Sequence, residues 1–317
     1  MSTARVELKG TGQVADKGFR WLALGAGLLV LVILVYIAVV MTNEARPAFQ
    51  LMGLDFITSD NWNPPQNVFG ALAFIYGTLL TSFIALLLAV PVSIGIALFI
   101  TQVAPRWLRN PMVYVLDLLA VVPSVVFGLW ALSTFAPAVQ GFYQSIADTV
   151  DGIPILDSIF STEQVSGRSF MTAGVIMAIM IVPIITSLSR EVIDTTPAGE
   201  REAALALGAT RWEMIRGAVF PHSKGGLVGA TMLGLGRAMG ETIAVALVIG
   251  SAAQITPNVF APGDSMPAVI ANQFGEASGD FRAALIGLAV VLFVITILVN
   301  VAATTVVQRS IKKSRGL

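Results

Sequence analysis

The chain has 317 residues, of which 56% are hydrophobic and 12% are charged, and its formal net charge is zero. An ordinary soluble domain carries about 25% charged residues, so this composition excludes a soluble globular protein and predicts an integral membrane protein. The absence of cysteine excludes a disulfide framework and a thiolate metal site. The single histidine, His222, cannot build a zinc site alone. We expect it to be an ordinary polar residue at the end of a loop.

Hydrophobic segments long enough to cross a bilayer, which takes about 20 residues, recur along the chain. The first is too long for a signal-peptide core, so we expect it to be an uncleaved span. Pro91, Pro123 and Pro183 fall inside spans two to four and predict kinked helices, because neighbouring helices can satisfy the carbonyls that proline frees. The pattern predicts an all-α membrane protein with six spans, at residues 21–42, 69–102, 112–135, 170–189, 226–251 and 283–307.

Lysine and arginine are distributed unevenly between the segments that connect these spans. With the N-terminus in the cytoplasm, the outside loops carry only Arg46, Arg168 and Arg282 among the 19 basic residues. Because cytoplasmic loops are enriched in lysine and arginine, this asymmetry predicts that both termini are cytoplasmic. The tails at residues 1–20 and 308–317 are then cytoplasmic.

The segment between spans four and five, "DTTPAGEREAALALGATRWEMIRGAVFPHSKGG", has the pattern of two short helices around a glycine. Thr196 is expected to cap the first helix, and Gly208 to end it in a left-handed conformation. Thr210 and Glu213 have capping-box spacing at the start of the second helix, which Pro221 ends or bends. A DNA-binding helix-turn-helix is disfavoured, because the segment is tethered between two spans. A plain connecting hairpin is the simpler alternative.

Within this segment, "EAALALGATRWEMIRGAVFP" resembles the EAA loop of ABC-importer permeases. In that family the loop forms a coupling helix that docks in a cleft of a separate ATPase subunit. The resemblance assigns the coupling segment to residues 196–221 and its landmarks to Glu202, Ala203, Ala204 and Gly208. The chain contains no Gly-Lys dipeptide and hence no phosphate loop of the Walker A type. We therefore expect no cofactor in this chain, with ATP and Mg²⁺ bound by the partner ATPase.

Span five, "GGLVGATMLGLGRAMGETIAVALVIG", contains two glycine pairs with the small-xxx-small spacing that lets membrane helices approach closely. These helix-packing candidates are Gly225, Gly229, Gly236 and Gly240.

The same span carries Arg237 and Glu241 near mid-bilayer, on a stripe about 100° round the helix from the second glycine pair. An ionisable residue inside a membrane span indicates a functional site. One alternative is a structural pair that neutralises itself at i, i+4 spacing. The other is a transport path, in which the planar fork of arginine matches an oxyanion such as phosphate. Glu241 would then orient Arg237 between cycles or accept a hydrogen bond from protonated phosphate.

Four segments carry a fuller resemblance: "YGTLLTSFIALLLAVPVSIGIALFITQVAP", "AVVPSVVFGLWAL", "VIMAIMIVPIIT" and "GLGRAMGETIAVALVIG". Together they are similar to the permease subunits of bacterial phosphate ABC importers, over residues 69–307 and with an extra N-terminal span. The resemblance implies a type I (MetI-like) permease fold in the bacterial cytoplasmic (inner) membrane. In that family an arginine and a glutamate are implicated in phosphate passage, which carries over to Arg237 and Glu241.

The family also implies partners: a homologous second permease, two copies of a cytoplasmic ATPase, and an extracytoplasmic phosphate-binding protein, with no nucleic acid. This chain would perform no covalent chemistry. Three alternatives remain open: a permease for another oxyanion (phosphonate, sulfate or molybdate), an ion-coupled secondary transporter, and a purely structural or regulatory membrane subunit. Asp117, in span three, is either a further polar residue of the path or an interfacial residue.

Overall fold

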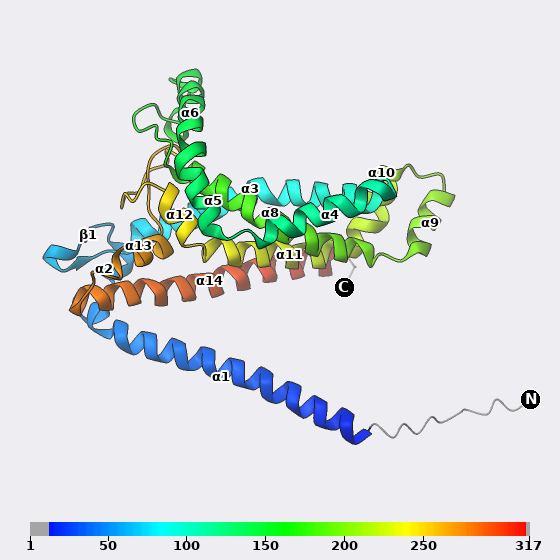
Figure 1. The fold of residues 1–317 in the computed structure, drawn as a ribbon, viewed down its shortest axis with the longest axis horizontal. Coiled ribbons are helices and arrows are strands. Elements are labelled where there is room, and N and C mark those ends of the chain that lie inside the picture. Colours follow the sequence, from blue (N-terminus) through cyan, green and yellow to red (C-terminus); the bar gives the residue numbers. More distant parts are fainter. Residues whose placement is uncertain (1–12, 315–317) are drawn as a thin grey trace, which may run out of the picture.

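The computed structural model describes residues 13–314, with side chains described from 16 to 305. Its long helices run side by side in one bundle (Figure 1). At the centre, α8 (Phe170–Asp194) packs against α3 (Leu72–Leu98) and α11 (Phe220–Met239), and α11 also contacts α14 (Gly279–Ser314). The first helix, α1 (Gln13–Met52), packs against α14 and diverges from the bundle toward its own start.

The two ends of the bundle carry different small elements. One end, the α9 end, carries α9 (Ala198–Ala206) and α10 (Arg211–Met214), and the described chain begins and ends toward this side (Figure 1). The opposite end, the hairpin end, carries an antiparallel pair in which Trp62 lies opposite Phe69. Its elements are α2 (Asp55–Thr58), β1 (Trp62–Asn63), a 3-10 turn η1 (Pro64–Gln66), β2 (Val68–Phe69), α7 (Leu156–Ile159) and α13 (Met266–Gln273).

The described chain has five helical segments long and apolar enough to cross a membrane: Asp16–Met52, Leu72–Val103, Ser124–Val150, Phe170–Asp194 and Gly279–Thr305. The expectation that residues 112–135 and 226–251 each form one helix is wrong, since both segments contain a break. Hydropathy is continuous across these breaks, so it does not reveal them.

The expected span at residues 112–135 breaks at Val122, between α4 (Arg106–Val121) and α5 (Ser124–Trp130). Val122 is extended, with ψ of 125°, because the ring of Pro123 disfavours a helical conformation in the residue before it. After α5 the chain continues into α6 (Ala136–Val150), which turns away from the bundle in Figure 1.

Two helices extend beyond the apolar segments that identified them. α1 begins at Gln13 and α14 runs to Ser314, so parts of the expected tails, 1–20 and 308–317, are helical. Hydropathy marks the residues that suit hydrocarbon, whereas the helical hydrogen bonds continue past them. Residues 1–12 and 315–317 of those tails lie outside the described residues.

Three wider π turns interrupt the helices, and each lies just before a proline. They are η2 (Phe99–Val103), η3 (Ala131–Phe135) and η4 (Ile215–Val219), followed by Pro105, Pro137 and Pro221. Within a continuous helix a proline ring clashes with the carbonyl four residues earlier, which belongs to the middle residue of η3 and of η4. η2 instead ends α3, because Ala104 and Pro105 after it are extended. Pro221 thus does not end the second helix of the coupling segment, because the chain stays helical from 211 to 239.

A stripe of small residues forms the close contact between α11 and α8. A Cβ added at Gly234 would lie 2.6 Å from Ile185 Cδ1, and one at Gly226 would overlap the Val192 side chain. Between and after these glycines, Ala230 and Ala238 are buried. The expected glycine pairs do not form this contact. A Cβ added at Gly229 or Gly236 would meet nothing within 4 Å, and Gly225 and Gly240 are exposed.

Gly226→Ala is expected to destabilise the subunit by about 1–3 kcal/mol, because its methyl group would overlap the stiff, β-branched Val192. Gly229→Ala is the matched control, since it adds a methyl group on the same helix without an overlap. Thermal unfolding in detergent measures both. Equal melting temperatures for the two variants would show that α11 and α8 are not closely packed at Gly226.

The loop between α12 (Ile243–Val248) and α13 closes the hairpin end as an ordered cap. Tyr76 donates a hydrogen bond to the carbonyl of Thr256 at 2.6 Å, and the ring of Phe260 stacks on Tyr143 at 4.4 Å. The cap also holds the buried Asp264, whose carboxylate accepts a hydrogen bond from the backbone N–H of Ser265 at 2.8 Å. Burial raises the pKa of Asp264 to about 7, partly offset by that hydrogen bond.

Stability should therefore depend on pH through Asp264. Because its pKa in the folded protein is above the ordinary 3.8, its contribution to stability is present below about pH 4 and lost as the pH rises through 7. Asp264→Asn should flatten the fall in melting temperature from about pH 5 to about pH 8. Asp280→Asn, at an exposed acid of the same end, should leave that fall unchanged. An unaltered profile in Asp264→Asn would refute this assignment.

Candidate functional site

The turn between α9 and α10 has the geometry that the sequence predicts. Gly208 has a φ of +86°, a left-handed conformation that glycine adopts without steric cost. The capping box of α10 is confirmed: Thr210 Oγ1 accepts from the Glu213 N–H at 3.3 Å, and Glu213 Oε2 accepts from the Thr210 N–H at 2.7 Å. The hydrogen bonds from Thr210 favour the charged carboxylate and lower the pKa of Glu213.

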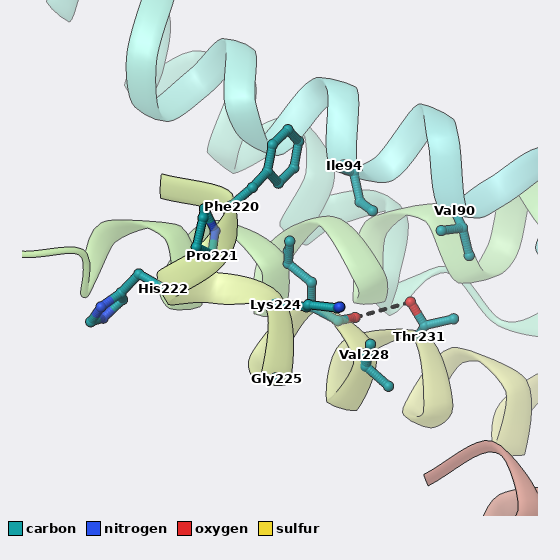
Figure 2. A pocket seen from close by; sticks show the side chains of 10 residues that line it. Val90, Ile94, Phe220, Pro221, His222, Lys224, Gly225, Val228 and Thr231 are labelled. Carbon is teal, nitrogen blue, oxygen red and sulfur yellow. Dashed lines mark hydrogen bonds between the residues drawn. The ribbon is translucent and has the colours of Figure 1, made fainter. Parts of the chain in front are cut away.

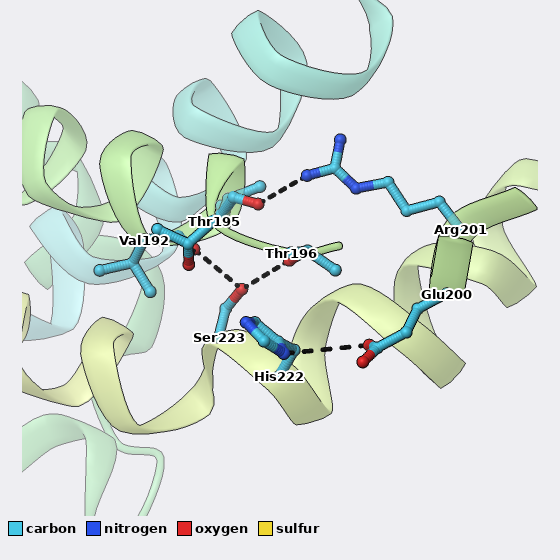
Figure 3. A network of polar contacts seen from close by, with 8 residues as sticks. Val192, Thr195, Thr196, Glu200, Arg201, His222 and Ser223 are labelled. Carbon is cyan, nitrogen blue, oxygen red and sulfur yellow. Dashed lines mark hydrogen bonds and ion pairs between the residues drawn. The ribbon is translucent and has the colours of Figure 1, made fainter. Parts of the chain in front are cut away.

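Thr196 does not cap α9, contrary to expectation. Pro197 occupies the N-cap position without a side-chain hydrogen bond. The Thr196 side chain is instead buried, with its Oγ1 3.4 Å from Ser223 Oγ at the start of α11. It therefore connects the coupling segment to the bundle, where polar contacts gather between three elements (Figure 3).

The coupling segment presents one face to its surroundings. Glu202 and Ala203 are exposed, whereas Ala204 is half-buried against the apolar cluster around η4. Leu207 beside them is 89% exposed and Trp212 is 61% exposed. Neither of these two large apolar residues is among the predicted coupling residues, although an apolar residue beside the glycine of a polar loop is a usable signal.

Arg237 lies on an exposed stripe of α11. The stripe consists of His222, Gly225, Gly229, Leu233 and Arg237, all exposed and spaced by three or four residues. That spacing places them on one side of the helix. The first expected glycine pair thus lies on the same exposed side of α11 as Arg237, and Gly225 with His222 also lines a cavity between α11 and α3.

Arg237 is level with the middle of the bundle. Two close contacts fix how α11 lies against α8, Gly226 against Val192 and Gly234 against Ile185. The helices are antiparallel, so Arg237, about one turn beyond Gly234, is level with the centre of α8. This level agrees with the expectation of a mid-membrane position, which stays a prediction.

Glu241 lies in a break rather than on the same helix as Arg237. α11 ends at Met239 and α12 begins at Ile243, with Gly240 as the C-cap residue. Glu241 is 9% exposed, and its Oε1 accepts a hydrogen bond from the backbone N–H of Ala244 at 3.4 Å. Glycine and threonine around a capping carboxylate explain the break, because both are weak helix formers.

No ion pair joins Arg237 and Glu241 within the part of the chain that the structure describes. The expected stripe of two charges at i, i+4 spacing on one helix is therefore wrong, and so is the self-neutralising pair. The two groups have separate environments: the guanidinium is exposed and the carboxylate is buried at a helix start.

A cavity of about 830 Å³ lies between α3 and α11 toward the α9 end (Figure 2). Val90 and Ile94 line it from α3, and Lys224, Val228 and Thr231 from α11. Neither Arg237 nor Glu241 contributes to its wall. A second cavity of about 490 Å³, between α1, α11 and α14, is lined by the second glycine pair, Gly236 and Gly240.

Two other polar candidates have simple surroundings. Asp117 is exposed on α4, directed away from the residues of this chain. His222 lies in the first turn of α11, 3.9 Å from the carboxylate of Glu200. Among the described residues, no group of three or more histidines and acidic residues is placed to hold a metal ion.

A helical bundle with an exposed coupling segment, and with an arginine exposed level with its middle, is the arrangement expected of a membrane subunit of an importer. A family model for the inner membrane components of binding-protein-dependent transport systems matches residues 89–312. The chain belongs to this family, and it is a multi-pass membrane component of a transport system.

Relatives from three organisms carry one name. The chain is 42% identical to "Phosphate transport system permease protein PstC" of Xylella fastidiosa strain Temecula1, over 94% of this chain and 92% of the relative. It is 43% identical to the protein of that name from Mesorhizobium japonicum, over 93% and 91%. It is 40% identical to "PstC 2" of Mycobacterium tuberculosis, over 92% and 91%.

Solved structures share the fold. A bacterial ABC transporter involved in the import of the acidic polysaccharide alginate aligns with a TM-score of 0.60 and 18% identity, over 94% of this chain and 99% of that chain. The inward-facing MetNI methionine ABC transporter aligns with a TM-score of 0.52 and 17% identity, over 76% and 94%. The predicted all-α, type I permease fold is confirmed.

Proposed function

We propose that this chain is the phosphate permease of an ABC importer, with Arg237 as an anion contact in its translocation path. The observation that carries this proposal is the exposed guanidinium of Arg237 at the middle of the bundle, without an ion pair among the described residues. The substrate is the one for which the relatives are named, phosphate. A planar guanidinium forms two parallel hydrogen bonds to phosphate oxygens, which suits this substrate.

The second wall of the path is a homologous permease subunit. The stripe that bears Arg237 is exposed, and Gly225 and Gly229 on it have the spacing that admits a second helix closely. Glu241 caps α12 and holds the break open next to Arg237, so its role is to position the path. This positioning role replaces the expected role of Glu241 as the residue that directly orients the Arg237 guanidinium.

The coupling segment docks on a cytoplasmic ATPase through its exposed face. Glu202, Ala203 and the large apolar side chain of Leu207 are available there. Two ATPase copies bind ATP and Mg²⁺, and their closure moves the segment. A phosphate-binding protein delivers the substrate at the hairpin end. The α9 end and both termini are then cytoplasmic, in agreement with the distribution of lysine and arginine.

Competition for uptake tests the substrate. In proteoliposomes that contain the complete complex, ATP-driven uptake of labelled phosphate should be reduced by unlabelled phosphate and unaffected by equal sulfate or molybdate. Uptake that survives collapse of the membrane potential but requires ATP excludes an ion-coupled transporter. Equal competition by sulfate would refute phosphate as the preferred substrate.

A further inference from the structure

Polar contacts link α9 and the residues just before it to α8 and α11 (Figure 3), whereas α9 itself packs mainly on η4 and α10. Glu200 in the first turn of α9 lies 3.9 Å from His222 Nδ1 at the start of α11. Ser223 Oγ lies 3.4 Å from Thr196 Oγ1 and 3.5 Å from the carbonyl of Val192 in α8. Arg201 Nη2 donates to the carbonyl of Ile193 at 2.8 Å. We call Thr196, Glu200, Arg201, His222 and Ser223 the α9–α11 joint.

The covalent connection from α9 to α11 contains two features at which helices bend. Along the chain, α10 reaches α11 through the π turn η4 and then Pro221. A π turn and a proline are the features at which helices bend, since regular i to i−4 hydrogen bonds are lost there. Motion entering at α9 could be absorbed by bending at η4. The joint connects α9 to His222 and Ser223, beyond both soft features.

Burial distinguishes the strong from the weak parts of the joint. Ser223 is fully buried and Thr196 is 4% exposed, so their contacts are shielded from water. The side chains of His222 and Glu200 are 35% and 51% exposed, and a pair that exposed adds little to stability. The pair of His222 and Glu200 instead restricts the orientation of α9, because it opposes rotation of α9 about the Thr196–Ser223 contact.

From this arrangement we propose that the α9–α11 joint transmits movement of the coupling segment to α11, and thereby to Arg237. From Phe220 to Met239, α11 is one helix with Arg237 in its last turn, so displacement of its first turn moves the guanidinium. His222 and Ser223 are positioning residues in this mechanism. The inference rests on the proposed function for its ATPase partner, although it does not depend on which anion is carried.

The test uses the complete complex and a cysteine introduced by Leu233→Cys, on the exposed stripe of α11. The chain has no native cysteine, so a maleimide labels only this position within it. In the parent, the labelling rate should differ about fivefold or more between the nucleotide-free and the ATP–vanadate-trapped complex. Adding His222→Ala and Ser223→Ala should remove this difference while ATP hydrolysis continues. Asp194→Asn, exposed at the same junction, is the control and should retain it.

Three results would overturn the joint: an unchanged nucleotide effect in the double variant, loss of ATP hydrolysis together with labelling, or no nucleotide effect in the parent. The charge exchange Glu200→Arg with His222→Glu should show a larger nucleotide effect on labelling than His222→Glu alone. Such a partial recovery would support the joint. Phosphate uptake is measured in the same preparations. Absent uptake in a parent that still shows the nucleotide effect would refute phosphate transport and leave the joint supported.

Discussion

Arg237→Gln is expected to lower ATP-driven phosphate uptake about 100-fold, since two charge-assisted hydrogen bonds worth about 1.5 kcal/mol each are lost. Glutamine keeps most of the volume and removes both the charge and the planar fork. Arg237→Lys should be intermediate, near tenfold, because it retains a point charge without bidentate geometry. Initial rates of labelled phosphate uptake in proteoliposomes, normalised to the amount of assembled complex, measure the series.

Arg168→Gln is the matched control for this series. Arg168 is also exposed, but it lies in a loop at the hairpin end rather than on α11. Its substitution should leave uptake within about twofold of the parent, as is usual for surface changes of about 0.5 kcal/mol or less. Full uptake by a correctly assembled Arg237→Gln complex would show that Arg237 is outside the path.

Gly208→Val is expected to reduce uptake about tenfold through the coupling segment. A β-branched residue at a φ of +86° costs about 1–2 kcal/mol or more, so the turn would reorganise and α9 would lose its orientation. Space is not the cause, because an added Cβ at Gly208 would meet nothing within 4 Å. Co-purification with the ATPase and uptake rate measure the effect.

Gly208→Asn separates backbone conformation from side-chain size at this position. Asparagine adopts the left-handed region more readily than other non-glycine residues, so this variant should retain most of the activity that valine loses. If valine and asparagine behave alike, then a left-handed residue at position 208 is not what the coupling segment requires.

Local chemistry made the coupling segment predictable. The Thr210–Glu213 box and the left-handed Gly208 depend on a few neighbouring residues, and both occur as expected. Thr196 was assigned wrongly because its partner, Ser223, is distant in sequence. The neighbouring residues alone favour Thr196 as a helix cap. Its burial against α11 instead places the Thr196 hydroxyl next to Ser223.

The candidate site was only partly predictable. Arg237 was identified by its charge, but the break at Gly240 was not, because apolar residues continue on both sides of it. The contact between α11 and α8 depends on small residues at every fourth position, Gly226, Ala230, Gly234 and Ala238. That run was visible in the sequence, and counting only pairs of glycines concealed it. Which stripe faces α8 and which faces outward is decided by tertiary packing.

The exposed position of Arg237 affects the free energy of the subunit in the membrane before it assembles with a partner. A lone subunit in the bilayer presents a guanidinium to lipid, at a cost of about 2.5–3.5 kcal/mol for an arginine near the centre of a membrane helix. In the proposed complex, a second permease over the same stripe would replace lipid with polar groups or water and remove that cost. The residue proposed to bind the anion would thus also favour assembly over the lone subunit.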